Sequence, residues 1–285
     1  MIAEVRPAPL AAIRDMFRLH RNSMKRVHLF EIHDQDWCPR SLRDAVTDYL
    51  QFAIASTKPY AAMIPVLASA LQRSGTRHVL DLCSGAGGPW FWLRPILAAQ
   101  GLSVSVCLSD KCPNLDAAGR ASQLIAEAIR YHPHPVDATR IPNELAGFRT
   151  MFTAFHHFRP EQARAVLADA VRKREGIAVF EATHNSLSGW LVVLLVPLMV
   201  ILMTPFIRPF RWSRLFWTYL VPILPFLVLF DGLVSSFRTY SVEELSELTG
   251  SLGSNDYHWD IGTLKSTPGP VPLTYLIGVP IRPAA

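Results

Sequence analysis

The sequence predicts an α/β protein with a doubly wound, mostly parallel sheet, an N-terminal helical cap and an inserted apolar helical hairpin. From residue 77 onward, short apolar segments alternate with segments of helix length, and a glycine-rich turn follows the first of them. Parallel strands need long crossovers, so this alternation favours a parallel sheet. An uncharged run then interrupts the pattern. We therefore expect four segments: a cap (1–75), a core (76–186), the hairpin (187–230) and a C-terminal completion of the core (231–285).

The composition narrows the class of protein. Half of the 285 residues are hydrophobic and 18% are charged, which excludes a disordered chain and favours contact with a membrane. The net charge of +5 is local, because residues 1–30 hold six Lys/Arg against two Asp/Glu, and residues 187–230 hold three Arg and no acid. A uniformly basic surface for nucleic acid is not expected. The four cysteines show no C-x-x-C pair, so neither a disulfide framework nor a zinc site is predicted.

The elements follow in chain order. A basic amphipathic helix near residues 10–27 could lie on an anionic membrane surface or dock on the core with its charged face in solvent. Strands are predicted at 77–82, 104–109, 150–155 and 177–180, with a weak strand around Val136, and helices at 89–99, 117–131 and 160–174. Beyond the hairpin, Ser241 and Glu244 form a capping box for a helix at 242–248. Two closing strands at 257–262 and 273–281 complete the sheet.

The uncharged run gives the strongest single signal. Residues 182–207 contain no charged side chain, and 187–207 would extend about 31 Å as a helix, close to the hydrocarbon thickness of a bilayer. A second run at 215–230 is only about 24 Å long, and five prolines interrupt the two runs or the turn between them. A kinked or re-entrant hairpin is therefore as plausible as two straight spans. A buried core hairpin or a dimerisation element is the alternative.

A glycine-rich loop follows the first strand of the core. The segment H-V-L-D-L-C-S-G-A-G-G-P-W at 78–90 is a strand, a turn and the start of a helix, the context in which such a loop binds a cofactor. It lacks both the dinucleotide fingerprint and a Walker A lysine. Asp110 ends the next strand, where a carboxylate can accept both hydroxyls of a ribose, and Asp137 ends the weak strand, where it can read an adenine edge.

These segments resemble the class I S-adenosylmethionine-dependent methyltransferases. V-L-D-L-C-S-G-A-G resembles that family's first motif, S-D-K its ribose-binding turn, V-D-A its adenine-binding turn and R-T-M-F-T-A-F-H-H-F its fourth-strand motif. The similarity covers about residues 77–186 and 231–285, and Cys83 stands where the family usually has its first glycine. It implies a Rossmann-like methyltransferase fold, S-adenosylmethionine as cofactor and a set of cofactor-binding residues: Asp81, Cys83, Ser84, Gly85, Gly87, Asp110, Lys111, Asp137, Ala138 and Phe155.

Candidate catalytic residues lie in two places. His156 and His157 follow the fourth strand, where the resemblance places residues nearest the reactive methyl group, and an imidazole can act as a base near neutral pH. Glu31 and Asp34 lie in a dense polar segment before Arg40 and either orient the acceptor or form surface ion pairs. Methyl transfer requires no metal, and His132 with His134 lacks a third ligand, so no metal site is expected.

The resulting hypothesis is a membrane-associated methyltransferase that acts on a lipid or another hydrophobic small molecule. The hairpin and the basic N-terminal helix would contact membrane lipids, with Arg208, Arg211 and Arg214 reaching headgroups and the catalytic domain on the cytoplasmic side. Two alternatives remain open: a non-catalytic membrane scaffold, and a soluble enzyme that forms a homo-oligomer through the hairpin.

Overall fold

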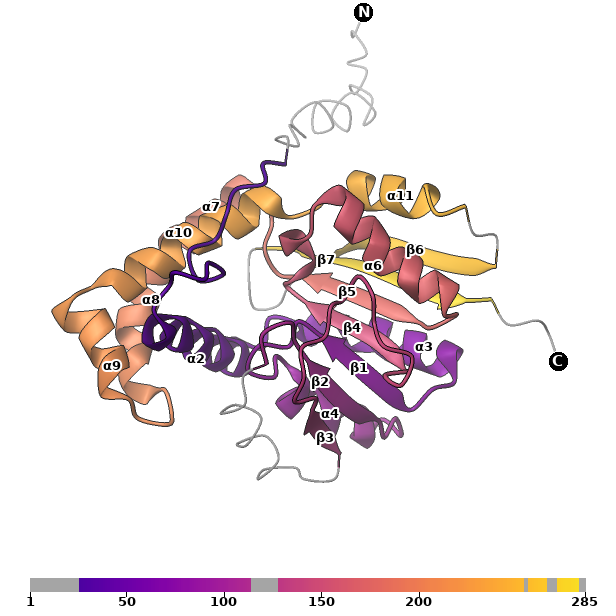
Figure 1. Cartoon of the computed structure of the whole chain (residues 1–285), viewed down its shortest axis with the longest axis horizontal. Helices are drawn as coiled ribbons and strands as arrows, with labels where there is room; N and C mark the ends of the chain where they lie inside the picture. The colour runs from indigo at the N-terminus through magenta and orange to yellow at the C-terminus, as the bar shows by residue number, and fades with distance from the viewer. Residues whose placement is uncertain (1–25, 114–127, 254–255, 266–270, 282–285) are drawn as a thin grey trace, which may run out of the picture.

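The computed structural model describes residues 26–113, 128–253, 256–265 and 271–281. Within them, one sheet contains seven strands in the order β3-β2-β1-β4-β5-β7-β6 (Figure 1). Neighbours among β1 to β5 are parallel, whereas β7 runs antiparallel to both β5 and β6. The strands are β1 (His78–Leu82), β2 (Ser105–Ser109), β3 (Ile129–Tyr131), β4 (Phe148–Phe152), β5 (Ile177–Glu181), β6 (Tyr257–Leu264) and β7 (Leu273–Pro280). The predicted doubly wound, mostly parallel sheet is confirmed.

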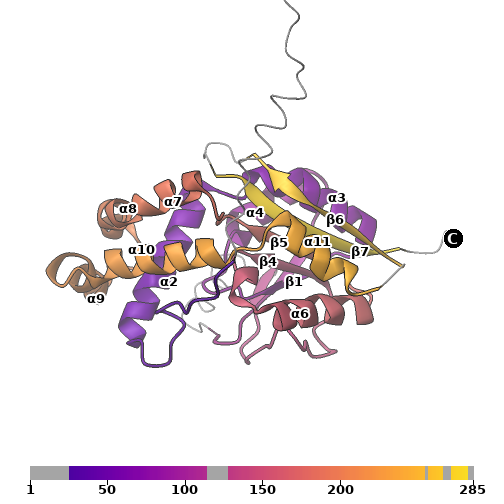
Figure 2. The same ribbon diagram turned by 90° about the horizontal axis from the view of Figure 1, so that it is seen from above.

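Helices cover both faces of this sheet (Figure 2). On one face α3 (Ile64–Ser74) and α4 (Trp90–Ala99) bury a core that includes Leu67, Leu97 and Phe148. On the other face α6 (Pro160–Arg172) and α11 (Val242–Gly250) bury a second core around Leu167 and Met151. The strands between them are buried on both sides, as expected when crossover helices lie on both faces of a sheet.

Most predicted elements agree with the structure within a few residues. The capping box of α11 is present, since Glu244 N donates to Ser241 Oγ and Ser241 N donates to the Glu244 carboxylate. Two predictions need correction. Strand β4 begins at Phe148, two residues earlier than predicted, and the third strand is Ile129–Tyr131 rather than a segment around Val136. The residues of β3 were predicted to form the end of a helix at 117–131. Most of that predicted helix lies outside the described residues, and so does most of the predicted basic helix at 10–27.

The apolar insertion is a bent helical hairpin that projects from one end of the core (Figure 1). Its first arm is α7 (Leu187–Leu194), α8 (Val196–Met203) and the 3-10 turn η3 (Thr204–Phe206). Together they form the 20-residue helix Leu187–Phe206, which is long and apolar enough to cross a membrane. The second arm is α9 (Trp212–Leu215), the π-helical turn η4 (Phe216–Leu220) and α10 (Ile223–Arg238). It bends by 82° between Leu220 and Ile223, because Pro222 interrupts the helical hydrogen bonds there.

The hairpin packs on the N-terminal cap through α2 (Arg40–Thr57). Leu42 and Tyr49 of α2 share a buried cluster with Val200, Leu224 and Leu227 of the hairpin. A charged contact lies at its edge, where the Arg214 guanidinium bonds the Asp48 carboxylate at 2.6 Å and the carbonyls of Ile207 and Pro209.

This packing corrects the expectation that the three hairpin arginines reach lipid headgroups. Arg214 is only 1% exposed, and Arg211 lies 3.4 Å from the Asp48 carboxylate and 3.7 Å from that of Asp44. Arg208 is exposed. Arg211 and Arg214 therefore form ion pairs with aspartates of α2, and these ion pairs attach the tip of the hairpin to that helix.

The rest of the hairpin surface is apolar and exposed. Among the described residues, 17 of the 23 large hydrophobic side chains that are exposed lie between Leu187 and Phe230, including Leu198, Trp212 and Phe226. An apolar surface of this extent marks a site of contact with a membrane or with another protein chain.

Candidate functional site

The fold brings two groups of side chains to the carboxyl ends of β1 and β4. The strand order reverses between these two neighbours, since β1 is followed along the chain by β2 on one side while β4 lies on the other. In open α/β sheets, ligands bind in the crevice at such a switch point. The glycine-rich loop follows β1, and the 3-10 turn η2 (Phe155–His157) follows β4.

The loop after β1 is held against the end of β2. Gly85 N donates a 2.9 Å hydrogen bond to the Asp110 carboxylate, whose second oxygen accepts from Cys112 N at 2.9 Å. Ser84 N donates to Ser109 O at 3.0 Å, and the Tyr131 hydroxyl of β3 donates to Gly85 O at 3.1 Å. Sequence reasoning found Gly85 and Asp110 but missed Tyr131, which lies in the strand that was wrongly placed.

Four residues of this loop, Cys83, Gly85, Gly87 and Gly88, adopt backbone conformations that favour glycine. Gly85 has φ of 51°, and apart from its own chain neighbours no described atom lies within 4 Å of the position that a Cβ would take. A ligand can therefore approach the backbone closely at this point. Gly87 has φ of 116°, and a Cβ there would lie 2.3 Å from the Phe91 ring. Cys83 has φ of 55°, so the cysteine at the position of the family's first glycine keeps the left-handed conformation.

Asp81 supports the loop from below. Its carboxylate accepts 2.6 Å hydrogen bonds from the hydroxyls of Ser84 and Thr150, and Asp81 is only 1% exposed. Burial raises the pKa of Asp81 to about 6, although both hydroxyl hydrogen bonds act in the opposite direction. Asp81 therefore stabilises the loop conformation through these hydrogen bonds.

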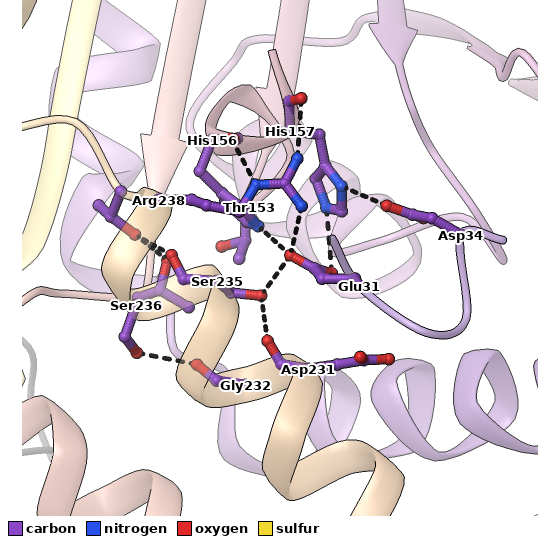
Figure 3. A network of polar contacts seen from close by, with 12 residues as sticks. Glu31, Asp34, Thr153, His156, His157, Asp231, Gly232, Ser235, Ser236 and Arg238 are labelled. Carbon is purple, nitrogen blue, oxygen red and sulfur yellow. Dashed lines mark hydrogen bonds and ion pairs between the residues drawn. The ribbon is translucent and has the colours of Figure 1, made fainter. Parts of the chain in front are cut away.

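The second group is a buried cluster of two histidines and a glutamate, shown in Figure 3. Nε2 of His156 lies 3.5 Å and Nε2 of His157 3.7 Å from the nearest carboxylate oxygens of Glu31. Glu31 and His156 are 2% and 1% exposed, whereas the His157 side chain is 27% exposed. The structure thus brings together all three predicted catalytic residues, although 125 positions separate Glu31 from His156.

Other polar groups orient this cluster from outside. Nδ1 of His156 lies 2.8 Å from the Glu181 carboxylate, and Nδ1 of His157 lies 2.8 Å from that of Asp34. Arg238 donates to the backbone carbonyls of both histidines and to Glu31, and Ser235 also donates to Glu31 (Figure 3). Glu181, Ser235 and Arg238 were not predicted, because nothing in the local sequence relates them to residues this far away.

Comparisons with known proteins agree with this topology. The citrinin polyketide synthase CMeT domain superposes with a TM-score of 0.52 at 13% identity, covering 89% of this chain and 60% of that one. Human N-acetylserotonin methyltransferase with S-adenosylmethionine gives 0.47 at 15% identity, over 85% of this chain and 58% of that one. The plantazolicin methyltransferase gives 0.45 at 10% identity, over 84% and 98% of the two chains. No family model and no curated protein matches the sequence.

The chain has the fold of the class I S-adenosylmethionine-dependent methyltransferases.

Within the methyltransferase fold, the predicted cofactor residues occupy different environments. Lys111 is exposed, and so is Asp137, whose carboxylate accepts from N and Oγ1 of Thr139. Ala138 is buried in the core around Met151. The Phe155 side chain is fully buried against Phe158 and Tyr240, in the cluster against which Cys83 of the loop also packs, so its contact with the cofactor stays a prediction.

The two groups of the methyltransferase core are electrostatically linked. Burial raises the pKa of Asp110 above its usual value, although its hydrogen bonds from Cys112 N and Gly85 N lower it. Across the site, the charge of Asp34 raises the same pKa and that of His157 lowers it. In the cluster, burial lowers the pKa of His156, but the carboxylates of Glu181 and Glu31 raise it to about 9 overall. Burial likewise raises the pKa of Glu31, but the histidines hold it well below its usual range. The cluster therefore favours positive charge on His156, between the carboxylates of Glu31 and Glu181.

Proposed function

We propose that the protein is a membrane-associated S-adenosylmethionine-dependent methyltransferase that acts on a lipid or another hydrophobic small molecule. The observation that carries the cofactor assignment is the 2.9 Å contact between Gly85 N and the Asp110 carboxylate at the switch point of the sheet. It brings an approachable backbone and a carboxylate to one place, as binding of a nucleoside requires. Human N-acetylserotonin methyltransferase, which is similar in fold, was solved with S-adenosylmethionine.

The reaction needs few groups from the protein. The acceptor attacks the methyl carbon, the bond from that carbon to sulfur breaks with its electron pair left on sulfur, and the acceptor loses a proton. The protein mainly aligns the two reactants and receives the proton. His157 has the most exposed side chain of the three cluster residues, whereas His156 is buried and held by Glu181. We therefore assign proton acceptance to the His157 side of the cluster and positioning to His156.

The hairpin supports a hydrophobic acceptor. Its exposed apolar side chains continue along α10 as far as Phe230, and the next residue, Asp231, already belongs to the polar surroundings of the cluster. A lipid-soluble acceptor could pass from a bilayer to the cluster along this helix without crossing water. Bound lipid and catalytic domain would then meet at the base of the hairpin.

Calorimetric titration of the full chain tests the cofactor assignment. We expect S-adenosylmethionine and its demethylated product to bind, and Asp110→Ala to weaken binding about 10- to 100-fold, since hydrogen bonds to a charged group contribute about 1.5–3 kcal/mol. Glu247→Ala, at an exposed position on α11, serves as the matched control. Absence of binding by the unaltered chain would favour the non-catalytic scaffold.

Flotation with liposomes tests the membrane assignment. We expect the full chain to float, and Leu198→Asp with Phe226→Asp, both at exposed apolar positions, to reduce flotation by more than half. Replacing the exposed Arg208 by Ala leaves the apolar surface intact and is the control. A chain that stays in solution without detergent as a dimer would instead indicate that the hairpin is a dimerisation element.

A further inference from the structure

We propose that Glu31, His156 and His157 form a binding site for a divalent transition-metal cation, with Zn²⁺ as the expected occupant. The site uses two imidazole nitrogens and one carboxylate oxygen, and these ligand atoms all lie within 4.8 Å of one another. It differs from the sequence-based expectation, which included no metal.

The spacing of the three groups suits a central cation better than direct hydrogen bonds. The distances of 3.5 Å and 3.7 Å from the imidazole Nε2 atoms to the Glu31 oxygens exceed the usual range of about 2.7–3.2 Å for an N–H···O bond. Ligands about 2.0–2.2 Å from a tetrahedral Zn²⁺ lie roughly 3.4 Å from one another. A small closure of the side chains around the cation would therefore complete the coordination.

The outer nitrogens of both histidines are already held as they are in metal sites. A metal-bound histidine almost always donates its other N–H to a carboxylate or carbonyl, which fixes its tautomer. Here Glu181 and Asp34 lie 2.8 Å from the two Nδ1 atoms. With a cation bound, the Nδ1 protons would stay on the side of these two carboxylates and both Nε2 lone pairs would be directed at the cation.

An independent observation points to a ligand at the same place. His156 is 1% exposed, and its Nε2 atom has no hydrogen-bond partner in the described part of the chain. A buried polar atom is normally satisfied by a partner. Because this Nε2 is directed toward Glu31 (Figure 3), a metal ion bound there would supply the missing partner.

The ligand set also indicates which metals fit. Imidazole suits Zn²⁺ and Fe²⁺, whereas Mg²⁺ prefers oxygen ligands throughout. Three protein ligands leave a coordination position open for a small molecule, as in catalytic zinc sites. With the cation bound, His157 would hold the metal and a hydroxyl of the acceptor bound there would lose its proton to water, whereas without the cation His157 itself would accept the proton; only this last consequence rests on the proposed function.

Metal binding is tested directly on the full chain purified in detergent and stripped with a chelator. We expect one equivalent of Zn²⁺ per chain by competition with a fluorescent chelator, and Co²⁺ to produce the visible absorption bands of a low-symmetry site. Glu31→Gln, His156→Gln and His157→Gln should each weaken Zn²⁺ binding by at least 100-fold. The double change His132→Gln with His134→Gln removes a neighbouring pair of histidines outside the cluster and should leave binding unchanged.

Several outcomes would overturn the proposal. They are the absence of stoichiometric Zn²⁺ and Co²⁺ binding by the unaltered chain, unchanged affinity in the three cluster variants, or an equal loss in the control. If the variants at the buried positions Glu31 and His156 do not fold, the Zn²⁺ affinity of His157→Gln decides the test. The His157 side chain is partly exposed, so this variant is expected to fold. Titration of the same samples with S-adenosylmethionine separates the two proposals, since it tests the loop after β1 and not the metal site.

Discussion

Leu167 in α6 is completely buried, whereas Leu198 in α8 is 51% exposed, although both lie in apolar helical segments. The α/β core surrounds its leucines with a sheet and a second helix layer, as the core around Met151 and Leu167 illustrates. The hairpin has a partner only along α2, so its outer surface remains apolar and uncovered. Composition alone therefore does not distinguish a core helix from one that needs an external apolar partner.

The two regions also use charge differently. In the core, Arg149 is 1% exposed and pairs with Asp169 at 2.8 Å, between strand β4 and helix α6, which packs on the sheet. In the hairpin, Arg214 pairs with Asp48 across two segments 166 positions apart. Removing one partner of a buried ion pair strongly destabilises a protein, because the other charge stays buried without compensation. The Arg214 contact therefore makes the hairpin and the cap one structural unit.

The largest expected effect concerns this contact. Arg214→Ala should lower the free energy of unfolding by about 3–5 kcal/mol, because it leaves the Asp48 carboxylate buried with an incomplete set of partners. The measurement is a urea titration in a fixed detergent. Arg208→Ala, at an exposed position of the same turn, should change it by less than about 0.5 kcal/mol. Equal effects would show that the tip of the hairpin is not attached as described.

Matched leucine substitutions sharpen the comparison between core and hairpin. Leu167→Ala should cost about 3 kcal/mol, since it removes buried methyl groups and leaves a cavity. Leu198→Ala should cost less than about 1 kcal/mol in the same urea titration, because half of its side chain is already exposed. A large loss at Leu198 would mean that the hairpin surface is covered in the purified protein, for example by a second copy of the chain.

The pH dependence of stability tests the support beneath the loop. Burial raises the pKa of Asp81 from 3.8 to about 6. The folded state therefore binds this proton more tightly than the unfolded state, so the stabilisation is complete below pH 4 and is lost as the pH rises through 6. From pH 4 to 7 the unaltered chain should lose up to about 3 kcal/mol more than Asp81→Asn. Parallel pH profiles for the two proteins would contradict this account.

The smallest effect is expected at Cys83, which stands where the family usually has its first glycine. Cys83→Gly should change the free energy of unfolding by less than about 1 kcal/mol, because relief of the left-handed backbone is offset by the greater freedom of glycine in the unfolded chain. Gly87→Ala is the contrasting substitution, since a Cβ there meets the Phe91 ring and should cost about 1–3 kcal/mol. Thermal denaturation of both variants measures the difference.

The sequence predicted best what depends on neighbouring residues. Strands β1 and β2, the loop between Asp81 and Gly88 and the capping box of α11 follow from local patterns. Strand β4 was placed two residues late because Arg149 resembles a surface residue until its buried partner is known. Strand β3 was missed because it has only three residues.

The candidate site divides in the same way. His156 and His157 could be predicted because they follow the fourth-strand motif of the family resemblance, and Glu31 because it lies in a dense polar segment. Arg238, which donates to Glu31 across 207 positions, could not. Contacts of this kind are fixed only when the hairpin returns the chain to the core.

That return is made by one helix with two chemically different ends. Phe226 and Phe230 lie on its outer part, and Ser235 and Arg238 reach Glu31 from its inner part. Twelve residues separate Phe226 from Arg238, a rise of about 18 Å along a helix. Helix α10 thus acts as a spacer of fixed length. An extra turn inserted between Phe230 and Ser235 would increase the distance between the histidines and the surface that the phenylalanines contact by about 5 Å.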